Sequence, residues 1–368
     1  MNMLQHILLT GTLLFCTSSA IANFDATIPV IDLNDFHSPT RHDDFIRDLS
    51  AALQSCGFVA ISNAGVNNKT LDQAYDAAQQ FFNLPLITKQ RNLAPQTSGQ
   101  RGYVQSETAK GNSTKDFKEF YHIGRDANIW PNESSFKPAM QNLIAALDEH
   151  VAIIEQALSE SIGERPDFFS KMTENGAYLL RVIHYPANPP ADSIWAAAHT
   201  DIDLFTILPR ATAAGLQVQN AKGEWIDVIV PENAFILNAG DMLQNLTNGV
   251  YKSSKHRVVS SDKNIERYSI VAFIHPKATD NVGPLNKFIQ QVGQRKFADA
   301  TQYELLSERL VDLGLNSPAM LRDLAESGLM ERLIAVGRAS NGAMRALRTA
   351  NLASPLIIKE LNKNTKPQ

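Results

Sequence analysis

His-Thr-Asp at residues 199–201 and His-Arg-Val at residues 256–258 bound the stretch that decides the fold. Successive side chains of a strand point to opposite faces, so His199 and Asp201 point the same way from one extended segment. The 55 residues that separate Asp201 from His256 are enough for several antiparallel strands before the chain returns. Two imidazoles and one carboxylate on one side of an octahedral ion leave other positions open, which non-haem Fe(II) sites that activate oxygen prefer. The spacing therefore predicts a metal centre built by two strands that are distant in the sequence.

A second pair of polar residues follows the third candidate ligand. Arg267 lies 11 residues after His256, and Ser269 lies two residues further on, on the same face of a predicted strand. A guanidinium and a hydroxyl together make a charge-assisted cradle for a carboxylate. A metal triad beside such a clamp indicates a co-substrate that is a keto acid.

Six motifs in this order resemble the catalytic core of the Fe(II)- and 2-oxoglutarate-dependent dioxygenases, in the isopenicillin N synthase-like branch. The resemblance covers roughly residues 28–315. It implies His199, Asp201 and His256 as iron ligands, and it implies that Arg267 and Ser269 hold the distal carboxylate of 2-oxoglutarate. The motifs are His-Thr-Asp (199–201), Gly-Leu-Gln-Val (215–218), Asn-x-Gly-Asp-Met-Leu (238–243), Thr-Asn-Gly-x-Tyr-Lys-Ser (247–253), His-Arg-Val (256–258) and Arg-Tyr-Ser (267–269).

The resemblance implies a non-haem Fe(II) oxygenase that uses O2 and couples oxidative decarboxylation of 2-oxoglutarate to oxidation of a small molecule. Hydroxylation and desaturation are the expected outcomes, and the sequence does not name the substrate. One alternative is an oxidase of the isopenicillin N synthase kind, in which the clamp would hold a carboxylate of the substrate. Ethylene formation from 2-oxoglutarate shares the same ligands. A catalytically silent binding module and a zinc hydrolase are the alternatives from other classes, and the intact triad and clamp disfavour both.

Three tyrosines are candidates for contacts inside the pocket. Tyr185 ends a predicted strand that begins at Tyr178, and the family directs a tyrosine at this position toward the co-substrate or substrate pocket. We therefore group Tyr185 with the 2-oxoglutarate-binding residues. The family also places the segments around Tyr103 and Tyr121 near the substrate mouth, so these two are predicted substrate contacts; the alternative is that they are packing aromatics.

Three further residues have the chemistry of metal ligands but are not assigned as such. His122 alternates with Tyr121 and is interpreted as a surface histidine or one that lies behind the ligands. His184 would add a fourth protein ligand and leave fewer positions for oxygen and substrate, so we interpret it as structural. Asp203 shares a face with Asp201, which is kept as the ligand because it holds the His-x-Asp position.

Many short strands separated by turn signals predict a mainly β fold with flanking helices around a double-stranded β-helix, or jelly-roll, core. An apolar stripe from Phe136 to Ile162 predicts a long amphipathic helix that backs this core. The predicted organisation has an N-terminal region of helices and strands that packs on the core, the core itself, closing helices and a helical C-terminal extension. These parts span residues 23–175, 176–280, 281–315 and 316–368.

The C-terminal extension lies beyond the resemblance. Residues 316–368 carry eight Lys or Arg and four Asp or Glu, so this segment is basic while the whole chain has a net charge of −4. A docking or membrane-surface element is one interpretation. Because Gly and Asn interrupt its apolar stripe, the favoured interpretation is a helical cap over the barrel or a homodimer contact through the C-terminal helices.

Composition and the N-terminus set further bounds. The chain of 368 residues is 44% hydrophobic and 20% charged, as expected of a globular protein, and its acidic balance predicts no nucleic-acid partner. Its two cysteines cannot form a disulfide framework. Residues 1–22 carry no Lys, Arg, Asp or Glu and end in an Ala-x-Ala pattern, which is typical of a signal peptide. They predict a periplasmic or secreted enzyme without an integral membrane anchor after cleavage; the alternative is a cytoplasmic enzyme.

Overall fold

The computed structural model describes residues 27–363 except 65, 98, 108–115, 192 and 261. The predicted signal peptide, residues 1–22, lies outside the described residues. Among the described residues, no helix combines the length and the apolar character needed to cross a bilayer.

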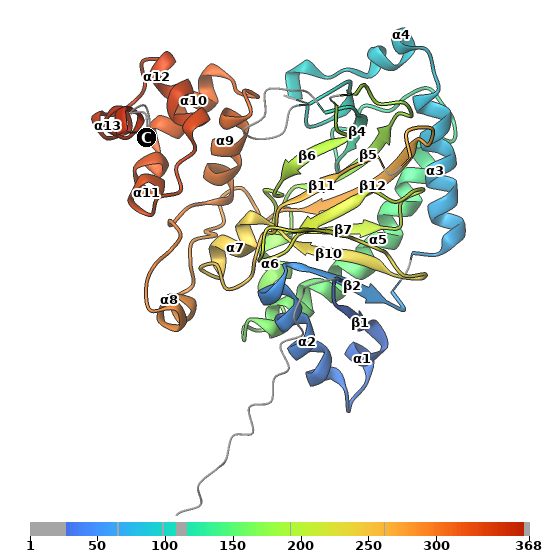
Figure 1. The fold of residues 1–368 in the computed structure, drawn as a ribbon, viewed down its shortest axis with the longest axis horizontal. Helices are drawn as coiled ribbons and strands as arrows, with labels where there is room; N and C mark the ends of the chain where they lie inside the picture. Colours follow the sequence, from blue (N-terminus) through green and yellow to red (C-terminus); the bar gives the residue numbers. More distant parts are fainter. Residues whose placement is uncertain are drawn as a thin grey trace, which may run out of the picture.

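Two β-sheets form the core (Figure 1). Neighbouring strands are antiparallel, with β1 and β2 as the parallel exception. The larger sheet has the order β1 (Val30–Asp32), β2 (Phe58–Ser62), β10 (Phe235–Ala239), β7 (Phe205–Pro209), β12 (Arg267–Ile274), β5 (Tyr178–Tyr185), β4 (Glu119–Ile123) and β3 (Gly102–Val104). The smaller sheet has the order β6 (Ala196–His199), β11 (His256–Val258), β8 (Leu216–Gln219) and β9 (Trp225–Asp227).

The inner faces of the two sheets pack on each other. Their shared apolar cluster combines Phe58, Phe120 and Ile183 of the larger sheet with Val218 and Val258 of the smaller one. This two-sheet sandwich with flanking helices is the predicted jelly-roll class. Strands β1 to β4 come from the region predicted to pack on the core, and they extend the same large sheet.

Helices cover the outer face of the larger sheet. The predicted amphipathic helix is α5 (Phe136–Ser161), which packs against α2 (His42–Ser55) and α3 (Asn68–Phe82). Its buried positions repeat at helical spacing, and Leu143, Leu147 and Leu158 are inaccessible to solvent. The shorter helices of the N-terminal half are α1 (Leu33–His37), α4 (Leu86–Lys89), α6 (Phe168–Thr173), and the 3-10 helices η1 (Gln90–Asn92) and η2 (Pro95–Thr97).

The segment after β12 closes one end of the barrel and then leaves it (Figure 1). Helix α9 (Gln302–Asp312) lies between the barrel and the predicted extension, and it begins with a capping box formed by Thr301 and Glu304. The extension is helical, as expected. The remaining helices are α7 (Asp241–Leu246), α8 (Asn286–Val292), α10 (Pro318–Glu326), α11 (Leu329–Ala335), α12 (Asn341–Thr349) and α13 (Pro355–Lys363).

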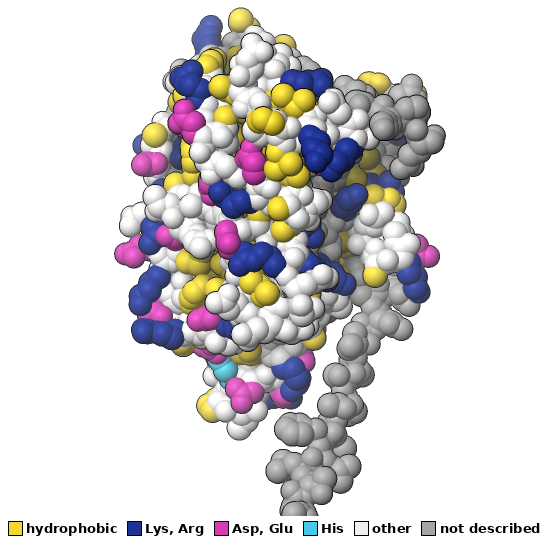
Figure 2. All heavy atoms as spheres, turned by 90° about the vertical axis from the view of Figure 1, so that its left-hand side faces the viewer, with side chains coloured by type: hydrophobic (Ala, Val, Ile, Leu, Met, Phe, Trp, Pro, Cys, Tyr) yellow, Lys and Arg dark blue, Asp and Glu magenta, His cyan; other side chains and the backbone are white. Residues whose placement is uncertain are grey.

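The surface of the extension that points away from the barrel mixes hydrophobic, basic and acidic side chains (Figure 2). Ser317 and Ser340 cap α10 and α12 by accepting hydrogen bonds from backbone N–H groups in the first turns. Leu324, Leu333 and Leu347 are buried within the extension. These three leucines belong to the same apolar cluster as the residues packed beneath α2, α3 and α5.

Candidate metal and co-substrate site

Three side chains converge between the two sheets as the spacing predicts. His199 ends β6 and His256 begins β11, and the two residues are paired directly across these antiparallel strands. Asp201 follows β6, and its Oδ1 lies 3.7 Å from His199 Nε2 and 3.6 Å from His256 Nε2. One atom from each of the three residues lies within 4.8 Å of the others, close enough to share one ion.

Hydrogen bonds orient each candidate ligand toward the shared point. The Oδ2 of Asp201 accepts hydrogen bonds from Thr206 Oγ1 at 2.8 Å and Asn238 Nδ2 at 3.0 Å, which leaves Oδ1 facing the histidines. Nδ1 of His199 lies 2.7 Å from the Ala197 carbonyl oxygen. Nδ1 of His256 lies 3.2 Å from the carbonyl oxygen of Ser254. With both Nδ1 atoms donating to carbonyls, both Nε2 atoms present lone pairs to an ion.

The protonation states favour metal binding. Burial, followed by the proximity of His256, lowers the pKa of His199 to about 3, so its imidazole is neutral at neutral pH. Burial acts to raise the pKa of Asp201, but the two histidines and the bonds from Asn238 and Thr206 lower it. A neutral imidazole and an ionised carboxylate are the states that bind divalent cations.

Asp203 differs from Asp201 although both side chains are buried. Burial and the neighbouring charge of Asp201 raise the pKa of Asp203 well above its usual value. Thr206 Oγ1 lies 2.8 Å from Oδ2 of both carboxyl groups. A protonated Asp203 can donate to Thr206, which then donates to Asp201. Asp203 thus lies behind the triad, in agreement with the choice of Asp201 as the ligand.

The guanidinium group of Arg267 is only partly satisfied by hydrogen bonds within the protein. It begins β12, is 4% exposed, and pairs across the strands with Tyr185. Its Nε donates to the Ala213 carbonyl at 3.0 Å, and its Cζ lies 5.1 Å from the centre of the Tyr185 ring. Its Nη1 is buried and, within the described part of the chain, has no hydrogen-bond partner. A buried guanidinium nitrogen left in this state costs free energy unless a ligand oxygen accepts from it.

Ser269 and Tyr185 lie on the same inner face as Arg267. Ser269 is paired with Ile183, and alternation along β12 places it next to Arg267 on that face. Both Ser269 and Tyr185 are buried. The structure therefore brings together the three residues that the resemblance assigned to the co-substrate.

A cavity of about 410 Å³ opens onto the metal triad. His199 and Asp201 line it together with residues of β4, β5 and α9. The apolar part of the wall includes Phe120, Phe273 and Leu310, and the polar part includes Lys118 and Arg181. Cavities of this size and mixed character are typical binding sites for small molecules.

The polar wall of this cavity is a partly buried ion-pair network. Glu107 Oε1 lies 2.6 Å from Lys118 Nζ and 2.7 Å from Arg181 Nη1. Although burial acts to raise the pKa of Glu107, Arg181 and Lys118 hold it below its usual range. Arg181 Nε also donates to His122 Nε2 at 2.7 Å. Sequence reasoning missed Lys118, Glu107 and Arg181, because their role depends on a cavity that only the folded chain creates.

The structure corrects the expectation for Tyr103 and Tyr121. The two are paired across β3 and β4 on the outer face of the large sheet, where they pack on Phe81 of α3. Tyr103 is 1% exposed and Tyr121 is 0% exposed. Their hydroxyl groups donate to Glu119 and to the carbonyl oxygen of Ile129. They are packing aromatics under the helices, on the face that points away from the triad.

The positions of His122 and His184 follow from the same alternation of side chains along β4 and β5. His122 is 2% exposed, so it is not a surface residue; it lines the cavity and accepts a hydrogen bond from Arg181. His184 lies on the outer face, between Glu119 and Glu266, and its ring stacks on Tyr268. Its interpretation as a structural histidine agrees with this position.

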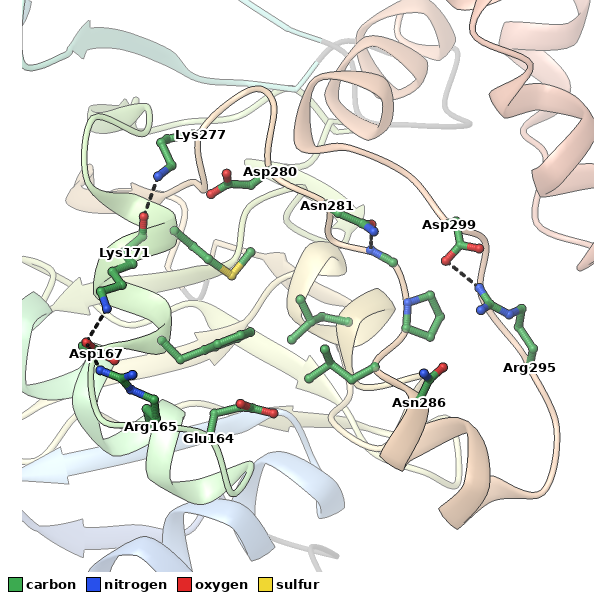
Figure 3. A pocket seen from close by; sticks show the side chains of 16 residues that line it. Glu164, Arg165, Asp167, Lys171, Lys277, Asp280, Asn281, Asn286, Arg295 and Asp299 are labelled. Atoms are coloured by element: carbon green, nitrogen blue, oxygen red, sulfur yellow. Dashed lines mark hydrogen bonds and ion pairs between the residues drawn. The ribbon is translucent and has the colours of Figure 1, made fainter.

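A second hollow, of about 750 Å³, lies between α6 and the segment that leads to α8 (Figure 3). Several of its charged side chains form ion pairs with each other: Asp167 pairs with Lys171, and Asp299 with Arg295 (Figure 3). It contains none of the three triad residues. Size alone would have selected this hollow, but the chemistry is in the smaller cavity.

The fold and the site together define a metal-dependent enzyme that takes a carboxylate-bearing co-substrate. A sequence profile of the 2OG-Fe(II) oxygenase superfamily matches residues 176–276, and a profile described as non-haem dioxygenase in morphine synthesis N-terminal matches residues 28–142. The chain is 31% identical over 287 residues to oxoglutarate-dependent flavonoid 7-O-demethylase 1 of Ocimum basilicum, covering 75% of this chain and 76% of that protein.

Two further similarities span most of the chain. Homoarginine-6-hydroxylase 2-ODD-C23.2 of Arabidopsis thaliana is 27% identical over 83% of this chain and 93% of that protein. The crystal structure of a full-length Neurospora crassa protein in complex with alpha-KG superposes with a TM-score of 0.71 at 27% identity, covering 79% of this chain and 98% of that one. The chain belongs to the 2OG-Fe(II) oxygenase superfamily and is an Fe(II)- and 2-oxoglutarate-dependent dioxygenase.

Proposed function

We propose that His199, Asp201 and His256 bind the Fe(II), and that Arg267, Ser269 and Tyr185 hold 2-oxoglutarate beside it. The observation that carries the second assignment is the buried Nη1 of Arg267, which has no partner among the described residues. The distal carboxylate of the keto acid would accept from it, with the Ser269 hydroxyl as a second donor. The ordered motifs support placement in the isopenicillin N synthase-like branch.

When bound, iron, 2-oxoglutarate and O2 supply the oxidising chemistry, coupled to decarboxylation of the keto acid. The protein contributes orientation. Thr206 and Asn238 keep one oxygen of Asp201 aimed at the ion. The carbonyls of Ala197 and Ser254 fix the two imidazoles. Arg267 neutralises the far carboxylate in a place that water does not reach, where charge-assisted bonds are strongest.

The substrate is a small molecule that occupies the cavity above the triad, and hydroxylation or desaturation is the expected reaction. The apolar wall around Phe120, Phe273 and Leu310 suits a largely apolar body. The network of Glu107, Lys118 and Arg181 offers polar contacts on one side. Ethylene formation from 2-oxoglutarate is the alternative reaction that shares this ligand set.

Anaerobic reconstitution with Fe(II), followed by titration of 2-oxoglutarate in the visible spectrum, tests the assignment. A weak charge-transfer band should grow to saturation. In Arg267→Met, we expect the dissociation constant for 2-oxoglutarate to rise about 100-fold, because a charge-assisted pair of bonds is lost. The matched control is Arg257→Met, since Arg257 stacks on Trp225 and bonds Gln217 in the smaller sheet.

Three outcomes separate the candidate functions. A band that is lost in Arg267→Met and kept in Arg257→Met supports the clamp. Bound iron without any band in the parent would contradict the proposed position of 2-oxoglutarate beside the triad. Equal affinity for 2-oxoglutarate in the parent and Arg267→Met would contradict the role of Arg267.

Export and dimerisation stay predictions. The expected signal peptide at residues 1–22 predicts a periplasmic or secreted enzyme, which N-terminal sequencing of the mature chain checks. The C-terminal helices remain the candidate homodimer contact, and sedimentation of the mature enzyme checks it.

A further inference from the structure

Arg309 is a buried cation in the wall of the cavity, and the assignments above give it no role. It lies on α9 and is 8% exposed. The same helix face contributes Leu306, Leu310 and Leu313 to the cavity, one helical turn apart. A charged side chain in such an apolar row needs specific partners to offset the cost of burial.

The partners of Arg309 belong to the turn between the candidate metal ligands. Its Nη1 donates to the carbonyl oxygen of Thr200 at 2.9 Å, and Thr200 is the middle residue of His-Thr-Asp. Its Nη2 forms an ion pair with Asp241, the first residue of α7. The same Asp241 oxygen accepts a hydrogen bond from Thr200 Oγ1 at 3.1 Å. Thr200, Asp241 and Arg309 therefore form a closed ring of contacts.

Helix α7 holds the same turn through its backbone. The N–H of Asp241 donates to the Asp201 carbonyl at 2.8 Å, and the N–H of Met242 donates to the Asp203 carbonyl at 3.0 Å. The His-x-Asp turn is thus fixed from α7 by backbone contacts and from α9 by one side chain. Asp241 lies at the junction, because it contacts Asp201, Thr200 and Arg309.

Helix α9 in turn carries the C-terminal extension. Helices α10 and α12 pack against α9, which separates them from the barrel (Figure 1). The approach is close at Gly342, where a Cβ atom would collide with the side chain of Asp312 at the end of α9. Arg309 consequently links the metal-binding turn to the helix on which the extension is built.

We propose that Arg309 is a positioning residue that fixes the His-x-Asp turn to α9, the helix on which α10 and α12 of the C-terminal extension pack. The proposal rests on the proposed function, because it assumes that His199 and Asp201 bind the metal. Without Arg309, the Thr200 carbonyl and the Asp241 carboxylate lose their shared cation. The turn then has more freedom, and an ion held by His199 and Asp201 is bound less tightly.

Metal affinity measured without turnover tests the proposal. Purified full-length variants are titrated anaerobically with Co²⁺, and the visible spectrum reports both affinity and coordination. We expect Arg309→Met to weaken Co²⁺ binding about 10-fold or more, as is typical when a residue that orients a ligand is lost. Asp241→Asn removes the same ion pair from the other side, and we expect a loss of similar direction.

The matched control is Arg332→Met. Arg332 belongs to α11 and joins the extension to the start of α9, donating to Glu304 Oε1 at 2.6 Å and to the Asp299 carbonyl at 2.8 Å. Its replacement therefore removes an arginine contact of the extension without touching the His-x-Asp turn. We expect its dissociation constant for Co²⁺ to equal that of the parent, whatever happens to the melting temperature of the metal-free protein.

Weaker Co²⁺ binding in Arg309→Met or Asp241→Asn, together with parental affinity in Arg332→Met, supports the proposal. Folded Arg309→Met with a lower melting temperature but parental Co²⁺ affinity would reduce Arg309 to a stability contact and overturn it. Asp241→Asn decides the same question if Arg309→Met does not fold. Failure of the parent to bind Co²⁺ would instead overturn the metal assignment, and the positioning role with it.

Discussion

The two faces of strands β4 and β5 carry two charge networks with different surroundings. On the outer face, Glu119 accepts from Lys89 Nζ at 2.7 Å and from the Tyr103 hydroxyl at 2.5 Å, and it lies 2.8 Å from His184 Nδ1. Aromatic side chains close over this network beneath α3. On the inner face, Arg181 and Lys118 share Glu107, and this network lines the cavity that holds the triad.

The comparison shows that residue types alone do not distinguish a structural charge network from a network that lines the candidate site. Each face has a carboxylate, a lysine and a histidine within bonding distance of their neighbours. The two networks differ in the face of the sheet on which they lie, and a shift of one residue along a strand moves a side chain from one face to the other. Tyr121 and His122 are adjacent in sequence, yet one packs under the helices and the other lines the cavity.

The largest expected effect contrasts the two buried histidines of the opposite faces. His199→Ala removes a candidate ligand, so Co²⁺ binding and 2-oxoglutarate turnover should be abolished. His184→Gln changes the outer network and should leave Co²⁺ affinity at the parental value. Titration with Co²⁺ and assay of succinate measure both. Loss of metal binding in well-folded His184→Gln would break the distinction between the faces.

The outer network should matter for stability. Glu119→Gln leaves Lys89 buried without its anionic partner, and breaking a buried pair of this kind costs about 3 kcal/mol. Urea denaturation of the metal-free protein measures the free energy of unfolding. The affinity for 2-oxoglutarate should stay unchanged in the same variant. A change in that affinity without a loss of stability would contradict a structural role for the outer face.

His122 of the inner network should contribute to the pH dependence of the free energy of unfolding. Burial, followed by the charge of Arg181, lowers the pKa of His122 to about 3. Between about pH 3 and pH 6.5 the unfolded state binds a proton at His122 that the folded state does not, so stability falls as the pH falls. His122→Gln should remove this contribution, reducing the slope by up to about 1.4 kcal/mol per pH unit. Unfolding measured across this range would show no change of slope if His122 were accessible to protons in the folded state.

The smallest expected effect concerns Tyr121, which sequence reasoning placed at the substrate mouth. Tyr121→Phe removes one hydrogen bond to the Ile129 carbonyl and should cost about 1 kcal/mol of stability. Turnover of 2-oxoglutarate and its affinity should equal those of the parent. A selective loss of turnover, with stability unchanged, would return Tyr121 to the site.

The candidate metal and co-substrate residues could be selected from the sequence because their signals are local or ordered along the chain. His199 and Asp201 share a face through the period of a strand, and Arg267 and Ser269 repeat that pattern. The residues that hold them were harder to find. Asn238 lies inside a matching motif but gave no sign of contacting Asp201, and Arg309 lies 108 residues after Asp201 on a helix outside the core strands.

The sequence by itself determined the alternation of side chains along each strand, the order of the motifs and the helical character of the C-terminal extension. The alternation and the helical character depend on neighbours within a few residues, and the order of the motifs is read directly along the chain. Only the tertiary structure decided which side of β4 faces the cavity, which tyrosines are covered by α3, and that Arg309 reaches Thr200. Those outcomes depend on which distant elements pack on each face of the sheet. The two-residue alternation of side chains along a strand is the same whichever face is covered, so it cannot reveal them.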